Sequence, residues 1–195
     1  DKKEFIVFIA NFILATIFSF SGFSVDFSPF GVSFCASAGK RYIIISALGA
    51  SLGYILSGDS ICSLRYIASI LALIVILGAL KPFKEIRDNI LTPVISTFVC
   101  LFVTGLALAF SEKITVFSLL LCFSESLLGA VLAFLFKEVR SILSLKGSIK
   151  SLTSKEAIAL VISFSLLLLA LKDINTFNVF PAHIIATVII LICGK

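Results

Sequence analysis

Residues 90–110 read ILTPVISTFVCLFVTGLALAF, a run of 21 residues without a charged side chain. A helix of this length extends for about 30 Å, which matches the hydrocarbon core of a bilayer. Thr92 and Pro93 lie at its start, where the missing amide hydrogen of proline breaks no helical hydrogen bond. The run therefore predicts a transmembrane helix.

The whole chain has the same apolar character. Of its 195 residues, 59% are hydrophobic and 14% are charged, and the mean hydropathy is +1.18. A soluble domain is about half apolar and a quarter charged. At about 20 residues per span, there is room for seven or eight spans and for no folded soluble domain. We therefore predict an all-α, polytopic transmembrane bundle over residues 1–195, embedded in the lipid bilayer.

Eight apolar runs separated by polar turns define the predicted spans, and the second is short. Ser28 as the cap and Pro29 as the first helical residue begin a helix that would end at Gly39, about 16 Å later. The runs cover residues 5–23, 28–39, 42–57, 66–80, 90–110, 114–136, 157–171 and 179–193, and the polar stretch 137–156 is expected to be a loop or a short surface helix.

Basic residues predict the orientation. If all eight runs cross and the N-terminus is cytoplasmic, 13 of the 16 Lys and Arg residues lie inside, and only Arg65, Lys113 and Lys172 lie outside. A re-entrant second run would move Lys2 and Lys3 outside and make the split 11 to 5. Cytoplasmic loops carry an excess of Lys and Arg. This rule favours eight spans with a cytoplasmic N-terminus, and it explains the net charge of +5 without a nucleic-acid partner.

Two ionisable residues in apolar runs are candidate polar sites. Glu125 lies in the middle of the sixth run, and an ionisable group at that depth suggests a proton or cation site. The alternative, which we favour, is a protonated Glu125 hydrogen-bonded by Ser124, Ser126 or a neighbouring helix, because no Lys or Arg within a predicted span offers a partner. His183 is the only histidine, and we expect it to be hydrogen-bonded near the membrane interface.

Small residues at helical spacing predict close contacts between helices. Gly49 and Gly53 form a GxxxG pattern that Ser57 continues, and Gly129 and Ala133 repeat the spacing on the sixth run. Such faces let two backbones approach each other. We expect packing inside the bundle, with a dimer interface as the alternative.

Motifs for catalysis are missing from the sequence. There is no nucleophile elbow, phosphate-binding loop, metalloprotease signature or paired-carboxylate spacing. The five cysteines occur singly and without CxxC spacing, which supports neither a zinc site nor a disulfide framework. We therefore expect no catalytic residue, no metal ligand and no cofactor in this chain.

Three strings, in this order, resemble the N-terminal membrane region of the stage II sporulation protein E family. The first is SPFGVSF at residues 28–34, which follows one apolar run. The second is FSESLLGAVLAFLFK at residues 123–137, a glutamate followed by small residues and a basic end. The third is SLTSKEA at residues 151–157, a polar lead into the next run. Their order and spacing cover nearly the whole chain.

This resemblance implies the organisation of a longer protein. The family combines a membrane bundle with a central region that self-associates and contacts the division protein FtsZ. Its C-terminal part is a manganese-dependent serine phosphatase of the PP2C type, which acts on an anti-anti-sigma factor and so activates the first forespore sigma factor. The chain would be most of the membrane bundle, and its lack of Met fits a piece of a longer protein. Manganese, FtsZ and the anti-anti-sigma factor would belong to the missing regions.

We therefore predict a membrane anchor and localisation domain, not itself an enzyme, that holds a cytoplasmic phosphatase at the division septum during sporulation. Self-association is a further expectation. The alternative is a small secondary transporter, or a substrate-binding membrane subunit, with Glu125 as its intramembrane polar site. For an anchor, Gly53→Leu should lower the folded yield, whereas Glu125→Gln should be nearly silent.

Overall fold

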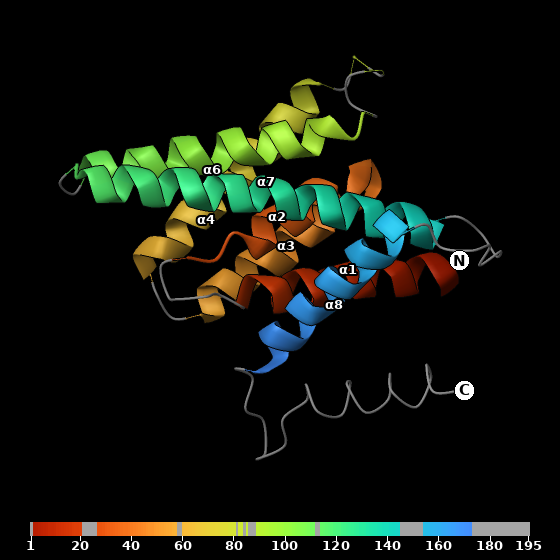
Figure 1. Ribbon diagram of the computed structural model, residues 1–195. Helices are drawn as coiled ribbons and strands as arrows, with labels where there is room; N and C mark the ends of the chain where they lie inside the picture. The colour runs from red at the N-terminus through yellow and green to blue at the C-terminus, as the bar shows by residue number, and fades with distance from the viewer. Residues whose placement is uncertain are drawn as a thin grey trace.

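The computed structural model is a bundle of helices (Figure 1). It describes residues 2–20, 27–57, 60–80, 82–83, 85, 89–111, 114–144 and 154–172. Within these ranges every element is a helix, which confirms the predicted all-α class. The helices are α1 (Lys2–Phe20), α2 (Phe30–Ser37), α3 (Gly39–Leu56), α4 (Ser60–Ala79), α6 (Leu91–Ser111), α7 (Val116–Ser144) and α8 (Ser154–Lys172).

Each of the first seven predicted runs overlaps one of these helices. Three segments are long and apolar enough to cross a membrane, namely Ile61–Ala79, Leu91–Ser111 and Val116–Ser141. Three shorter apolar helices accompany them, namely Glu4–Phe20, Arg41–Leu56 and Ala157–Leu168. The eighth run and His183 lie outside the described residues. The structure thus supports a membrane bundle, and eight spans remain a prediction.

Helix α2 is a short helix in the middle of the bundle and not a complete span. Its 8 residues extend for about 12 Å, too little for a hydrocarbon core of about 30 Å. It packs against α1, α3, α4, α6 and α7, and all of its residues except Phe34 are buried. It also begins later than expected, because Pro29 takes the cap position without a side-chain cap hydrogen bond and Phe30 is the first helical residue.

Helices α1 and α3 lie side by side and run in the same direction. Near their N-termini, Arg41 donates two hydrogen bonds of 2.8 and 2.7 Å to the carboxylate of Glu4. Further along, the Thr16 hydroxyl donates to the Gly49 carbonyl oxygen at 3.0 Å. The chain must therefore return to its starting end between α1 and α3, and α2 forms part of this return. Arg41 consequently lies at the same end as the N-terminus, as the eight-run arrangement expects.

The GxxxG face of α3 is occupied by α1. A Cβ atom added at Gly49 would collide with the carbonyl oxygen of Phe12. One added at Gly53 would lie 2.5 Å from the Thr16 carbonyl oxygen and 2.8 Å from Ser19 Cβ. The two backbones touch because glycine has no side chain. These contacts lie within the chain, as the internal-packing interpretation expects.

The other small residues fall into two groups. A Cβ atom at Gly129 would collide with Leu101 of α6, and Ala133 is completely buried in the core, so both residues serve internal packing. Ser57 differs from the prediction, because it is exposed at the end of α3. Its hydroxyl donates to the Tyr54 carbonyl oxygen at 2.7 Å. Ser57 therefore terminates the helix and takes no part in the packing face.

Helices α6 and α7 form an antiparallel hairpin (Figure 1). Helix α7 continues to Ser144, eight residues beyond the predicted end at Phe136, so the first part of the predicted polar loop is helical. At this end, Phe136 packs with Phe18 and Phe34 at ring distances of 4.8 and 5.6 Å. The long helix thus carries its basic C-terminal turns beyond the apolar core.

We expect Gly53→Leu to separate α1 from α3, because the new side chain would meet backbone atoms that cannot move away. Overpacking of this kind costs about 1–3 kcal/mol of unfolding free energy. Gly78→Leu is the matched control, because Gly78 is also helical and has no atom within 4 Å of an added Cβ. The measurement is the melting temperature and the monodisperse yield in detergent. Equal losses for the two variants would contradict the close contact.

Candidate functional site

The candidate site is built around α4, which begins earlier than the sequence predicted. The apolar run was expected to begin at Tyr66, with Arg65 outside the membrane. The helix instead starts at Ser60. Arg65 therefore lies about 8 Å along the helix, and its side chain is only 9% exposed. The expectation that Arg65 lies outside was wrong because it rested only on the residues near Arg65 in the sequence. Inside the bundle, the long Arg65 side chain can reach a partner that is distant in the sequence.

That partner is Glu125 on α7. One guanidinium nitrogen of Arg65 forms an ion pair with the Glu125 carboxylate, whose side chain is 3% exposed. The expectation that Glu125 has no cationic partner is therefore wrong. Removing two charges from water is expensive, and their attraction compensates only when further hydrogen bonds satisfy the remaining lone pairs. The surrounding contacts supply such bonds.

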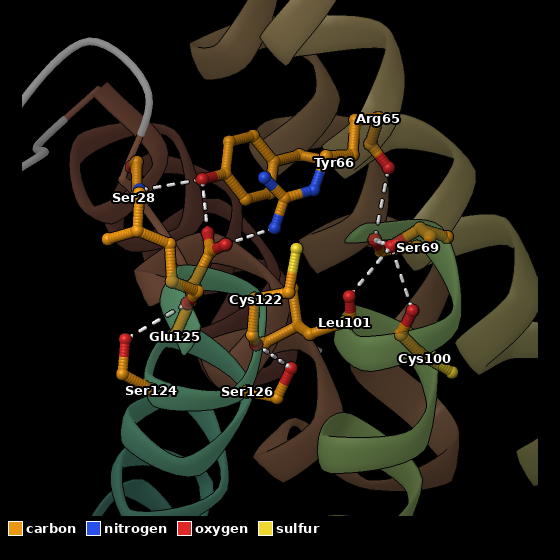
Figure 2. Close-up of polar contacts among 12 residues, drawn as sticks. Ser28, Arg65, Tyr66, Ser69, Cys100, Leu101, Cys122, Ser124, Glu125 and Ser126 are labelled. Carbon is orange, nitrogen blue, oxygen red and sulfur yellow. Dashed lines mark hydrogen bonds and ion pairs between the residues drawn. The ribbon is translucent and has the colours of Figure 1, made fainter. Parts of the chain in front are cut away.

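Tyr66 connects this ion pair to the chain just before α2 (Figure 2). Its hydroxyl donates to the second carboxylate oxygen of Glu125. The same hydroxyl oxygen accepts a hydrogen bond from the Ser28 amide at 2.7 Å. One tyrosine thus joins α4, α7 and the backbone that leads into the buried short helix.

Tyr54 of α3 completes the attachment of that backbone. Its hydroxyl donates to the Ser28 carbonyl oxygen at 2.7 Å, and its ring stacks on that of Tyr66 with centroids 4.7 Å apart. Both rings are 1% exposed. The Ser63 hydroxyl donates to the Tyr54 carbonyl oxygen at 2.5 Å. Both polar backbone groups of Ser28 are therefore satisfied by side chains, as buried backbone requires.

The two serines next to Glu125 do not contact its carboxylate. Ser124 donates to the Leu121 carbonyl oxygen at 2.9 Å, and Ser126 donates to the Cys122 carbonyl oxygen at 2.6 Å. Both bonds stay within α7 (Figure 2). Of the three donors considered for Glu125, the structure shows a neighbouring helix, through Tyr66, and neither of the two serines.

Gly105 of α6 makes room for the guanidinium. A Cβ atom at this position would lie 3.3 Å from an Arg65 nitrogen and 3.0 Å from Cys122 Sγ. One turn along α4, Ser69 and Thr104 share a hydrogen bond of 2.7 Å between their hydroxyls. In the described part of the chain, Nε of Arg65 is buried without a hydrogen-bond partner. The guanidinium thus makes one strong contact in a closely packed space.

The site holds two opposite charges that are buried together. Within the described ranges, no three His, Cys, Asp or Glu side chains gather as a metal site. Cys35, Cys100 and Cys122 are free thiols. What the arrangement offers is a neutral, internally hydrogen-bonded pair of charges that joins helices distant in sequence.

A comparison with protein families identifies the chain. The family described as "SpoIIE, N-terminal domain" matches residues 1–194. The chain belongs to this family. No curated protein matches the chain, and no solved structure matches it. Two of the strings that resembled the SpoIIE N-terminal domain contribute directly to the site, because they contain Ser28 and Glu125.

We expect a double-mutant cycle to reveal the coupling between Arg65 and Glu125. Glu125→Gln leaves a buried cation without its counter-charge, and Arg65→Gln leaves a buried anion, so each should cost about 3–5 kcal/mol. The double variant Arg65→Gln/Glu125→Gln removes both charges and should be much more stable than the sum of the single losses predicts. Thermal unfolding in a nonionic detergent measures all of them. Additive losses would contradict the pair, and a silent Glu125→Gln would restore the earlier expectation.

Proposed function

We propose that this SpoIIE N-terminal domain is a membrane anchor that holds a cytoplasmic serine phosphatase at the division septum during sporulation. The family match over residues 1–194 carries the proposal. An anchor requires a stable bundle with an apolar outer surface, and it needs no reactive group of its own.

The distribution of side chains supports an anchor. Large apolar residues face outward on several helices, including Val75, Phe110 and Phe117, which are 69%, 69% and 70% exposed. Exposed apolar surface on this scale is unstable in water and suits lipid. The buried charges, by contrast, are paired inside the bundle. A surface that is apolar and an interior that is neutral favour a passive role in the bilayer.

The basic residues at one end of the bundle support an orientation of the bundle in the membrane. Glu4 lies at the N-terminal end of α1, and Arg41 lies at the N-terminal end of α3. Arg140, near the end of α7, contacts Asn11 of α1. Basic residues from distant parts of the chain therefore gather at one end. The excess of Lys and Arg on the cytoplasmic side of membrane proteins supports a cytoplasmic location for this end.

Cysteine labelling tests this orientation. In a background without native cysteines, Ser111→Cys at the exposed end of α6 should react with an impermeant thiol reagent in intact cells. Ser148→Cys, in the polar stretch after α7, should react only after the membrane is opened. Labelling of Ser148→Cys in intact cells would reverse the orientation.

A secondary transporter is the second candidate, because an ionisable pair within a membrane bundle often marks a transport pathway. Coupled transport needs a carboxylate that changes its charge state, whereas an anchor needs only a folded bundle. The variant Arg65→Leu/Glu125→Leu separates these two requirements, since it can fold without any charge at the site.

We expect a fluorescent fusion of the full-length gene product to collect at the septum, and to lose this enrichment when residues 1–195 are replaced by an unrelated membrane bundle. The variant Arg65→Leu/Glu125→Leu should retain septal enrichment if it folds. Wild-type vesicles should show no ion-linked uptake. Loss of enrichment by the folded double variant, together with uptake in wild-type vesicles, would favour the transporter.

A further inference from the structure

Arg140 is held in an unusual position near the end of α7. One guanidinium nitrogen donates to Asn11 Oδ1 at 3.2 Å, and the guanidinium carbon lies 5.0 Å from the centre of the Tyr42 ring. Asn11 is itself fixed, because its amide nitrogen donates to the Val7 carbonyl oxygen at 2.7 Å. Three helices, α1, α3 and α7, therefore determine where this cation lies.

Arg140 differs from the other two arginines of the described bundle because no carboxylate neutralises it. Arg41 pairs with Glu4, and Arg65 pairs with Glu125. In the described ranges, the contacts of Arg140 are a neutral amide and an aromatic ring. A guanidinium has five N–H donors in a planar fork. Among the described residues, most of this donor capacity is therefore unused at a positioned, half-buried cation.

Neighbouring charges on α7 add to the positive field. Lys137 lies three residues before Arg140, and residues three apart share a helix face. Glu138 lies two residues before Arg140, and residues two apart do not face each other. The local acidic residue is therefore directed away, and the face of α7 that carries Arg140 has two cations.

The length of α7 up to Arg140 exceeds the thickness of the hydrocarbon core of a bilayer. Arg140 follows Val116, the first residue of the helix, by about 36 Å at 1.5 Å per residue. The hydrocarbon core is about 30 Å thick, and the headgroups extend the bilayer to about 40–45 Å. If α7 begins at one edge of the hydrocarbon core, Arg140 lies just beyond the other edge, at the level of lipid phosphates.

We propose that Arg140, positioned by Asn11 and Tyr42, binds the phosphate of an anionic phospholipid headgroup. A planar guanidinium matches two phosphate oxygens, and such charge-assisted pairs are the strong ones. The Tyr42 ring and the Asn11 amide hold the guanidinium in place. This site is separate from the Arg65–Glu125 pair and is independent of the proposed septal role.

Lipid retention tests the site. The chain is purified in a nonionic detergent and mixed with phosphatidylglycerol, and bound lipid is counted by native mass spectrometry. Arg140→Gln should bind the lipid about tenfold more weakly, which corresponds to the loss of one charge-assisted contact. Arg140→Lys should retain part of the binding, because it keeps the charge and loses the planar fork. Phosphatidylcholine should be retained poorly by all variants.

Arg41→Gln is the matched control, because Arg41 lies at the same end but is exposed and paired with Glu4. It should retain phosphatidylglycerol like the wild type. Unfolding without lipid is measured in parallel, so that only folded variants are compared. Equal losses for Arg41→Gln and Arg140→Gln would overturn the site in favour of general charge attraction. Wild-type binding by both Arg140 variants would also overturn it, as would competition by millimolar inorganic phosphate, which would indicate a free-phosphate site.

Discussion

The structure depends on one constraint, which is that the Glu125 carboxylate lies inside an apolar bundle and must be neutralised there. Arg65 supplies the counter-charge and Tyr66 supplies a hydrogen bond, and both come from adjacent positions on α4. Meeting this demand fixes α4 against α7, and Gly105 of α6 leaves the space in which the guanidinium fits. Packing alone distinguishes poorly between different rotations of an apolar helix about its own axis. A buried ion pair between two helices permits only one rotation of each helix.

The same network solves the problem of a helix that is too short to span. Irregular backbone at membrane depth is tolerated only where protein groups satisfy its amides and carbonyls. Ser28, just before α2, has both groups bonded by tyrosine hydroxyls from α3 and α4. The ion pair and the attachment of α2 are therefore one structure, because Tyr66 belongs to both. This arrangement explains why the two family strings around Ser28 and Glu125 are brought together.

Much of the fold could be predicted from the sequence, because long apolar runs specify helices one at a time. The helix over residues 90–110 could be predicted without knowing which helices pack against it. The GxxxG face around Gly49 and Gly53 correctly indicated close packing. The Arg65–Glu125 pair could not be found in this way, since its members are 60 positions apart and Arg65 lies just before the predicted apolar run. The length of α2 was also hard to predict, because Ser28 bonds partners on other helices in place of capping its own.

The parallel arrangement of α1 and α3 has a consequence for how the protein is made. In most membrane proteins, successive helices can enter the lipid as antiparallel pairs. Helix α1 cannot pair with α2 in this way, because the backbone N–H and C=O groups at the ends of the short helix would have no hydrogen-bond partners in lipid. The hydroxyl that accepts from the Ser28 amide belongs to Tyr66, which leaves the ribosome 38 residues later. The Ser28 amide therefore has no access to this hydrogen bond until α4 has been synthesised.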